Sequence, residues 1–561
     1  MEMEKKNVAI IVLAIALAAS GVGNIILGLQ GAQFVAPISK TLVLGTLSPP
    51  HVLDPVNSWD SASNDVIEQI AETLFYYNLS DTSLPRIPVL AETYWWESTT
   101  ILHVKLREGV IFHDLTPFNS TNALWNFDRM AYFFNATGTL PPTQSIGEPY
   151  SLYFFPDGVT PIINNVAAVG EYNLTFTLNA PFAPFLDLLC YTAGSMLSPL
   201  TTPATEYISL TYGRIVGTGP FVYEYYVPNV EVRMGGFEYY WGGAPFWETA
   251  IIASITDATT RNNAMLGHEI DWIQGAIPSL IPTFDADPTI TVKHFTDETG
   301  VPSLVYQYLG MNNVDIPTHW RKAISHALNY TYIIEELLNG LAIRAHGCVS
   351  PGYGDAFNAS NQAADYNLIT ARQTIVDNVP AASGFPVNSN PDDPTWLGAS
   401  LATYNYTYNI GNSFREDMFD ALTAWLPAIG ISVVDDGVTW SAFLRKLFAD
   451  QDELGLFWIG WGPDYKDPFN MLDPLFNPAS YADSGQVNDP KLNAMMALAL
   501  VTTDDTARNN IYKNIQWYMA NRLYPHCFGY HGKVTTVHDV HIRGIAYNAY
   551  GATRFYGTYR A

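Results

Sequence analysis

Charged residues are scarce in this 561-residue chain, and positive charge is the scarcer sign. Asp, Glu, Lys and Arg together make up 14% of the sequence, against about 25% in ordinary soluble domains. The 27 Lys and Arg residues face 53 Asp and Glu residues, which gives a formal net charge of −26. Nucleic-acid binding requires basic patches that displace counterions. The composition therefore excludes DNA and RNA as partners.

Cysteine is also scarce, and its spacing excludes the common thiol sites. Cys190, Cys348 and Cys527 form no CxxC pair, so a thiol-based metal or redox site is not expected. They are either buried thiols or one disulfide plus a free cysteine, and the sequence leaves both open. GHEID at 267–271 resembles a zinc motif, but Trp272 stands where the second histidine is required. We predict no cofactor, no metal and no catalytic residues, because the sequence lacks GxSxG, HExxH and Walker patterns.

Apolar residues are abundant instead. Hydrophobic residues make up 48% and aromatic residues 14% of the chain, which excludes a disordered protein. A chain of this length exceeds one ordinary hydrophobic core, so roughly two or three lobes are expected.

The N-terminal segment has the pattern of a secretory signal. Lys5 and Lys6 precede an apolar run at 8–19, and small residues follow it. The apolar character continues to Leu29, which is long enough for an uncleaved membrane anchor. Residues 1–35 are therefore a signal peptide or an anchor, with the body of the protein outside the cell. Seven Asn-X-Ser/Thr sequons agree with an extracellular glycoprotein; they lie at Asn78, Asn119, Asn135, Asn173, Asn329, Asn358 and Asn405.

Periodic apolar patterns predict alternating strands and helices. A strand is expected at 41–44, followed by a helix that Ser61 or Ser63 caps and whose apolar stripe extends to Leu74. Two runs around Pro228-Asn229 predict a hairpin. A helix is expected over 319–339, with Gly340 after its end.

The second half of the chain predicts a parallel sheet. Residues 351 onward begin a long irregular stretch, and 380–395 is rich in Pro, Ser, Asn and Asp. A strand at 404–410, a helix capped by Ser413 and a strand at 430–434 form a βαβ unit.

The stretch 457–468 joins a buried apolar strand, 454–461, to an acidic and aromatic loop. Ligands of open α/β sheets bind beyond the carboxyl ends of such strands. We predict that Asp464 projects into a crevice beside Trp461 and Tyr465. Gly460 and Gly462 leave the backbone free to pair with an extended ligand. A buried edge strand that ends in a capped turn is the alternative interpretation of the same residues.

The order of several motifs resembles the family 5 extracellular solute-binding proteins, the receptors of peptide ABC importers. The motifs are LDP at 53–55, LREGVIFHD at 106–114, GTGPF at 217–221, YYWGGAP at 239–245, GHEID at 267–271, RKAISHAL at 321–328 and WGPDYKDP at 461–468. Leu115 departs from the family pattern, which usually has Gly after the His-Asp pair.

The resemblance implies a fold of two α/β lobes around a cleft, with a subdomain inserted in the first lobe. Lobe I would comprise 36–60, 169–297 and 524–561, with the insertion at 61–168, and lobe II would comprise 298–523. Peptide-binding members place an Asp at the position of Asp464 against the ligand's α-ammonium group.

The resemblance also implies a receptor that passes a short peptide to the transmembrane subunits of an ABC permease. No Arg lies just upstream of Asp464 to pair with a peptide carboxylate, and Trp458, Trp461 and Tyr465 can stack on sugar rings. An oligosaccharide receptor of the same fold is thus one alternative. A structural cell-surface protein, favoured by the low charge and the sequons, is another.

Overall fold

The computed structural model describes residues 39–561 except 211–212, 380–392, 394–395 and 397–399. Lys40–Ala561 forms one compact unit. The predicted signal or anchor lies outside the described residues, and so does the predicted irregular segment 380–395 apart from Asp393. No helix in the described part of the chain has the length and apolarity needed to cross a membrane.

A seven-stranded sheet contains the first strand of the chain, β1 (Thr41–Thr46), at its centre. β1 is parallel to both of its neighbours. Leu42 and Leu44 pack in the core beneath α2 (Ser61–Ile70), whereas Val43 packs against the core of α5 and α6 on the other face. The sheet order is β12 (Ile290–His294), β19 (Thr535–Asp539), β11 (Trp272–Ile273), β1, β10 (Thr249–Ser254), β9 (Glu231–Gly236) and β8 (Phe221–Val227). The predicted hairpin is confirmed as β8–β9.

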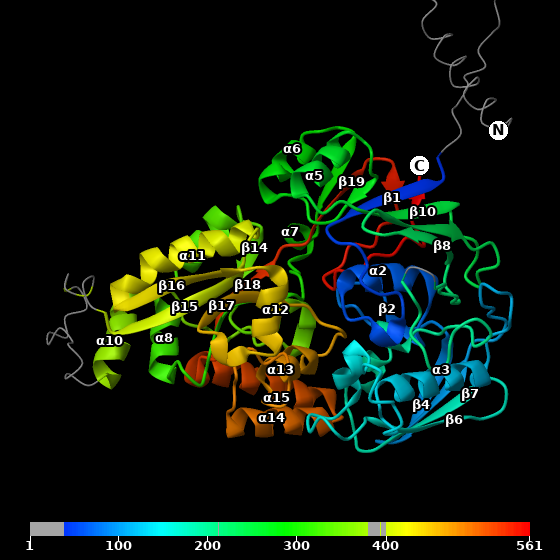
Figure 1. Ribbon diagram of the computed structural model, residues 1–561, viewed down its shortest axis with the longest axis horizontal. Helices are drawn as coiled ribbons and strands as arrows, with labels where there is room; N and C mark the ends of the chain where they lie inside the picture. The colour runs from blue at the N-terminus through cyan, green and yellow to red at the C-terminus, as the bar shows by residue number, and fades with distance from the viewer. Residues whose placement is uncertain (1–38, 211–212, 380–392, 394–395, 397–399) are drawn as a thin grey trace, which may run out of the picture. The chain divides into compact units, whose positions relative to one another are not determined.

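A six-stranded sheet carries the strand that leads to the predicted site. Its order is β14 (Ala342–Arg344), β18 (His526–Gly532), β13 (Tyr306–Met311), β17 (Leu456–Trp461), β15 (Ala402–Asn409) and β16 (Ile431–Val438). β15 and β16 are parallel and joined through α11 (Ser413–Trp425), which confirms the predicted βαβ unit. In Figure 1, α11 lies along this sheet beside β15 and β16.

The first half of β17 is buried on both faces. Leu456 and Trp458 pack in the core formed with α8 (Thr318–Ala327), α10 (Leu368–Asn378) and α11. Phe457 points to the opposite core, which α12 (Trp440–Phe448), α13 (Phe469–Phe476) and α15 (Asp505–Tyr518) help to form. The unbroken apolar run of β17 follows from this double coverage.

A third sheet of four strands lies within and just after the predicted insertion. Its order is β4 (Ala91–Ser98), β5 (Ile101–Leu106), β7 (Asn173–Leu178) and β6 (Ile163–Ala168), with α3 (Ser120–Phe133) packed beside it. The predicted C-terminal piece of lobe I is divided between sheets, since β18 joins the six-stranded sheet and β19 the seven-stranded one. The division into lobes stays a prediction.

The remaining elements are two strand pairs and a set of helices and helical turns. The strand pairs are β2 (Phe75–Tyr77) with β3 (Arg86–Pro88) and β20 (Ile542–Arg543) with β21 (Tyr559–Arg560). The other helices and helical turns are η1 (Pro55–Asn57), η2 (Glu148–Tyr153), α4 (Phe185–Leu188), η3 (Thr192–Gly194), α5 (Ala258–Leu266), η4 (Pro278–Leu280), α6 (Ile281–Asp285), α7 (Phe295–Thr299), α9 (Tyr330–Tyr332), η5 (Ile333–Leu337), η6 (Pro351–Ala356), η9 (Leu426–Ile429), η10 (Gln451–Glu453), α14 (Pro490–Val501) and η11 (Met519–Leu523).

Several predicted helix boundaries were wrong because a neighbouring polar side chain caps the backbone. Asp60, not Ser61 or Ser63, caps α2 by accepting a hydrogen bond from the Ser63 amide, and the helix ends before Leu74. The predicted helix 319–339 stops at Ala327, because Leu328 is extended and the side chain of Asn329 caps a new turn. The stretch after Pro351 is not all irregular, since Asn367 caps α10.

The turn at Leu115 forms without glycine. Leu115 adopts a φ of 67°, a left-handed conformation that a side chain disfavours. Asp114 holds the turn by accepting hydrogen bonds from the amide and hydroxyl of Thr116. The three cysteines are buried free thiols.

Candidate functional site

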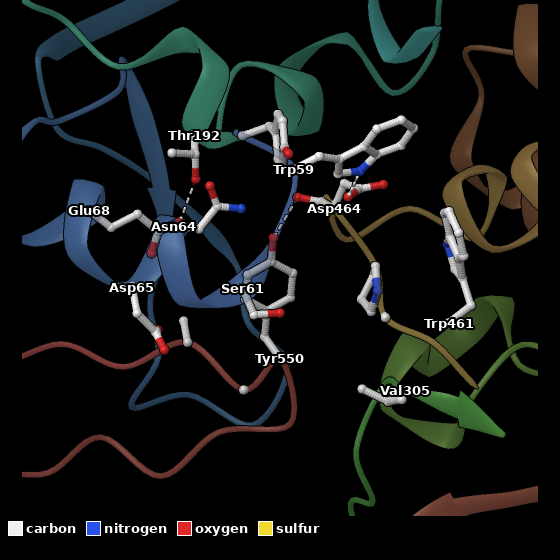
Figure 2. Close-up of a pocket in the computed structure, with 15 residues that line it drawn as sticks. Trp59, Ser61, Asn64, Asp65, Glu68, Thr192, Val305, Trp461, Asp464 and Tyr550 are labelled. Atoms are coloured by element: carbon white, nitrogen blue, oxygen red, sulfur yellow. Dashed lines mark hydrogen bonds between the residues drawn. The ribbon is translucent and has the colours of Figure 1, made fainter. Parts of the chain in front are cut away.

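A cavity of about 390 Å³ lies at the carboxyl end of β17, between elements attached to the two large sheets. One side is built from α2, η3 and the loop at 550–552, and the other from Val305 and the residues that follow β17. Figure 2 shows the fifteen lining residues, which are Trp59, Ser61, Asn64, Asp65, Glu68, Tyr191, Thr192, Val305, Trp461, Gly462, Pro463, Asp464, Tyr550, Gly551 and Ala552.

Asp464 is held rigidly by neutral groups. The indole N–H of Trp59 donates to its Oδ1 at 2.5 Å, and Asn470 Nδ2 donates to its Oδ2 at 3.0 Å. The Asp464 amide donates to Asn470 Oδ1 at 2.6 Å, and the Tyr550 hydroxyl donates to the Asp464 carbonyl at 2.6 Å. Asp464 thus receives support from α13 and from chain segments some 90 to 400 residues away in sequence.

The electrostatics of Asp464 suit it to bind a cation. Burial raises the pKa of its carboxyl to about 6, although the hydrogen bonds from Asn470 and Trp59 lower it. Among the described residues, no Lys, Arg or His forms an ion pair with it. A desolvated carboxylate without a counter-ion gains more from a ligand cation than one that is already neutralised.

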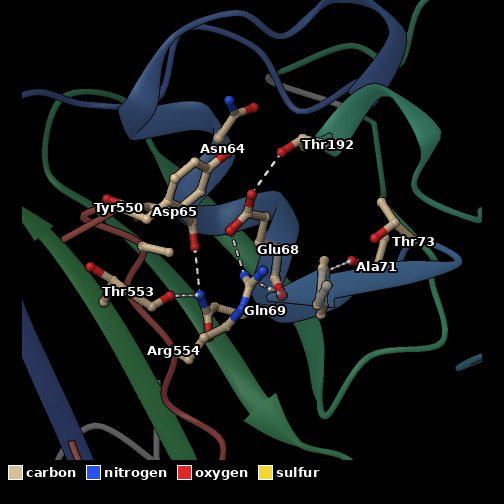
Figure 3. A network of polar contacts seen from close by, with 12 residues as sticks. Asn64, Asp65, Glu68, Gln69, Ala71, Thr73, Thr192, Tyr550, Thr553 and Arg554 are labelled. Atoms are coloured by element: carbon tan, nitrogen blue, oxygen red, sulfur yellow. Dashed lines mark hydrogen bonds and ion pairs between the residues drawn. The ribbon is translucent and has the colours of Figure 1, made fainter. Parts of the chain in front are cut away.

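The opposite side of the cavity carries two further carboxylates, one turn apart on α2. Glu68 forms an ion pair with Arg554 at 2.5 Å and accepts a hydrogen bond from the Thr192 hydroxyl at 2.8 Å (Figure 3). Asp65 accepts a hydrogen bond from Gln274 Nε2 at 2.8 Å. The two acids therefore differ in charge compensation, although both line the cavity.

Three of the five predicted site residues line the cavity. Trp461, Gly462 and Asp464 are among its walls, whereas Gly460 and Tyr465 are not. A Cβ at Gly460 would lie 2.1 Å from Nε2 of Gln307, so this glycine permits close packing in the sheet. Tyr465 is only 2% exposed and faces a smaller neighbouring cavity.

We predicted that the backbone at the end of β17 pairs with an extended ligand, and this requires a strand edge that is not already paired. β17 pairs with β13 along its whole length, but β15 covers only Leu456 and Phe457 on the other edge. Within the described residues, Trp458–Trp461 have no strand partner on that edge. Pairing between this backbone and a ligand stays a prediction.

Most of the cavity lining was not predicted from the sequence, including Trp59, Asp65, Glu68 and Tyr550. Asp65 and Glu68 lie on the polar side of α2, which in sequence is indistinguishable from a solvated face. Trp59 directly precedes the cap of that helix, and no sequence signal links it to Asp464, which lies 405 positions away. Tyr550 comes from an irregular C-terminal segment for which the pattern gave no prediction.

Comparison with known proteins places the chain in a family. The family model described as "Bacterial extracellular solute-binding proteins, family 5 Middle" matches residues 86–483. The chain belongs to the family 5 extracellular solute-binding proteins. The resemblance in the sequence motifs is thereby confirmed, and so is the class of solute-binding receptor.

Relatives of this solute-binding protein extend over most of its length. It is 25% identical over 502 residues to the glutathione-binding protein GsiB of Pectobacterium atrosepticum, which covers 87% of this chain and 88% of the relative. It is 24% identical over 531 residues to the dipeptide-binding protein of Escherichia coli, with 90% and 92% covered. The dipeptide-binding protein of a Pseudoalteromonas species, solved with Met-Leu, superposes with a TM-score of 0.76 at 20% identity, with 93% and 100% covered.

The structural match confirms the predicted fold class. The solute-binding protein has the two-lobed α/β fold of periplasmic binding proteins.

In the described part of the chain, no group of three or more His, Cys, Asp or Glu side chains is arranged to hold a metal ion.

Proposed function

We propose that this solute-binding protein is the receptor of an ABC importer and that it binds a short peptide, with the peptide's α-ammonium group on Asp464. The observation that carries the proposal is the state of the Asp464 carboxylate, which lines a cavity and has only neutral hydrogen-bond partners. The sequence relatives that are named for binding dipeptide and glutathione support the ligand class.

The geometry supports an ammonium ligand on physical grounds. Trp59 and Asn470 fix the carboxylate before the ligand arrives, so little conformational entropy is lost on binding. A charge-assisted hydrogen bond inside a partly dry cavity is roughly twice as strong as a neutral one. The volume of about 390 Å³ falls near the small end of ligand pockets, roughly 300–1,000 Å³, which suits a peptide of few residues.

The proposal also covers where the receptor is located and which partner it delivers the peptide to. The N-terminal segment 1–35 would export the protein and either be cleaved or anchor it, with the receptor on the extracellular face and the permease subunits as its partner. The sequons would carry glycans. The division proposed from the family resemblance places the cavity between lobe I and lobe II, so a ligand would contact both.

Calorimetry on the full-length chain tests the proposal. Di- and tripeptides should give binding heat, and Asp464→Asn should weaken their affinity by about 30-fold or more, which corresponds to about 2 kcal/mol. Asp417→Asn is the matched control, because Asp417 is an exposed carboxylate on α11 outside the cavity. This variant should bind like the wild type.

Two results would contradict the proposal. Equal peptide affinities for the wild type and Asp464→Asn would remove Asp464 from the site. Binding of neutral oligosaccharides without binding of any peptide would instead favour the sugar receptor.

A further inference from the structure

The charged residues that line the cavity are all acidic. Its fifteen lining residues include three carboxylates, those of Asp65, Glu68 and Asp464, and no Lys, Arg or His. A receptor that recognises a peptide by its two termini needs a cation for the terminal carboxylate as well as an anion for the ammonium. This cavity offers anions on both sides and no side-chain cation among its lining residues.

Glu68 cannot act as the second anion, because its charge is already neutralised. Arg554 forms an ion pair with it (Figure 3). The guanidinium carbon of Arg554 in turn lies over the ring of Tyr76, 4.2 Å from its centroid. The Thr192 hydroxyl occupies a further acceptor position of the Glu68 carboxylate. Glu68 and Arg554 therefore form a structural pair, in which Glu68 belongs to the cavity wall and Arg554 lies behind it.

Asp65 has no such compensation. Its carboxylate accepts one hydrogen bond, from Gln274, and forms no ion pair within the described residues. Burial raises its pKa to about 7, with the nearby charge of Glu68 acting in the same direction and Arg554 in the opposite one. Such a carboxylate is costly to ionise in the empty protein, and a cationic ligand group would remove that cost.

Asp65 is held in position by an amide network behind it. Gln274 Nε2 donates to Asp65 Oδ2 at 2.8 Å and also contacts the Thr553 hydroxyl at 3.1 Å. Gln69 Nε2 donates to the Asp65 carbonyl at 2.9 Å and to the Thr553 carbonyl at 2.8 Å. The carboxylate is thus preorganised, as Asp464 is on the other side of the cavity.

Aromatic rings line the space that a ligand side chain would cross. Tyr550 and Trp461 belong to the cavity wall together with the two acids (Figure 2). Rings of this kind pack against the apolar stem of Lys or Arg and attract its charged end. The cavity therefore matches a flexible cationic side chain better than a second anionic group.

We propose that the ligand is a short basic peptide whose α-ammonium group binds Asp464 and whose Lys or Arg side chain binds Asp65. This inference rests on the proposed function and specifies its substrate class. Under this inference Asp65 binds the ligand, whereas Glu68, one turn away on the same helix, does not. The terminal carboxylate of the peptide has no ionic partner in the cavity.

The test is a calorimetric comparison of two peptides on the full-length chain: alanyl-lysine and alanyl-norleucine, which differ only in the side-chain ammonium group. The lysine peptide should bind at least about tenfold more tightly. Asp65→Asn should reduce that preference to about threefold or less while leaving the norleucine peptide nearly unaffected. C-terminal amidation should change the affinity of the lysine peptide by less than about threefold.

The comparison separates this inference from the proposed function. Equal affinities of the two wild-type complexes would overturn the inference even if Asp65→Asn fails to fold, and so would a tenfold loss on amidation. A lysine preference that survives in a folded Asp65→Asn protein would overturn it as well. If both peptides bind and Asp464→Asn weakens both, the proposed function stands whatever the preference. If neither of these two peptides binds but other di- or tripeptides do, only the inference fails, and if no peptide binds, both proposals fail.

Discussion

Asp464 and Asp467 lie in the same loop between β17 and α13, but their surroundings are opposite in kind. Asp467 is 3% exposed, accepts hydrogen bonds from the Tyr512 hydroxyl at 2.6 Å and the Phe469 amide at 2.8 Å, and lies 3.6 Å from Arg508. Asp464 lines a cavity and has only neutral donors. One carboxylate has its cation within the fold, and the other has none.

The comparison shows how a single loop combines structural and binding roles. Removing a buried charge from its partner destabilises the fold, so Asp467 anchors the loop to α15. Asp464 is presented by that anchored loop, and its unbalanced charge is available to a ligand. Both aspartates stand in the same acidic stretch, WGPDYKDP. Their different surroundings are therefore set by residues that are distant in the sequence, Trp59 for Asp464 and Arg508 and Tyr512 for Asp467.

The largest expected effect is the loss of stability in Asp467→Asn. The change leaves Arg508 with only the exposed Asp505, at 2.9 Å, as counter-ion and weakens the contact to Tyr512, so the free energy of unfolding should fall by about 2 kcal/mol. Asp464→Asn should lower it by less than about 1 kcal/mol, because no internal cation loses its partner. Urea denaturation of both variants measures the difference. Similar losses in the two variants would remove the distinction between the carboxylates.

Trp59→Phe should weaken peptide binding by roughly tenfold at pH 6, because the carboxylate of Asp464 loses a donor worth about 1.5 kcal/mol. The new side chain keeps an aromatic ring near Trp461 and Tyr481. Loss of the donor also raises the pKa of Asp464 further, so the defect should shrink at pH 8. Calorimetry at the two pH values checks this, and a defect of equal size at both would show that Trp59 acts by shape alone.

The pH dependence of binding should follow the ionisation of Asp464. Only the carboxylate form binds an ammonium group, and the pKa of Asp464 is raised to about 6. Affinity should therefore fall by about tenfold between pH 7 and pH 5, while the ligand amine stays protonated. Titrations in buffers of different ionisation heat should show proton release at pH 5. Asp65 faces the same cavity and burial raises its pKa to about 7, so Asp464→Asn should flatten the profile only in part. An unchanged profile in that variant would contradict the assignment.

Glu68→Gln should give the smallest effect. It leaves the charge of Arg554 uncompensated behind the cavity wall, which disfavours a cationic ligand. Arg554 still interacts with the nearby charge of Asp65, so the loss of peptide affinity should be limited to about threefold. A loss as large as that of Asp464→Asn would mean that Glu68 binds the ligand directly.

Much of the fold was predictable because the sheets are built from local patterns. The strand at β17, the hairpin β8–β9 and the βαβ unit around α11 each follow from apolar periodicity and turn residues. The errors lie where one polar side chain outweighs that periodicity. Asp60 and Asn329 each cap a helix that the apolar stripe alone placed differently.

The site was predictable only on the side where a strand ends. Asp464, Trp461 and Gly462 were identified because a carboxyl strand end is a recognisable place for a ligand. Asp65 and Glu68 are separated from Asp464 by about 400 positions in the chain, and their contacts with Gln274 and Arg554 are set by tertiary packing. Helical periodicity describes which side of α2 is buried, and it does not distinguish solvent from a cavity on the other side.

The most direct test of the central claim is to titrate one dipeptide and its N-acetylated form into the wild type and into Asp464→Asn. Acetylation removes the ammonium charge and keeps the rest of the peptide. We predict that it weakens wild-type binding by about 30-fold or more and changes binding to Asp464→Asn by less than about threefold, because the two groups interact directly. Equal losses on acetylation in the two proteins would contradict the claim that the ammonium group binds Asp464.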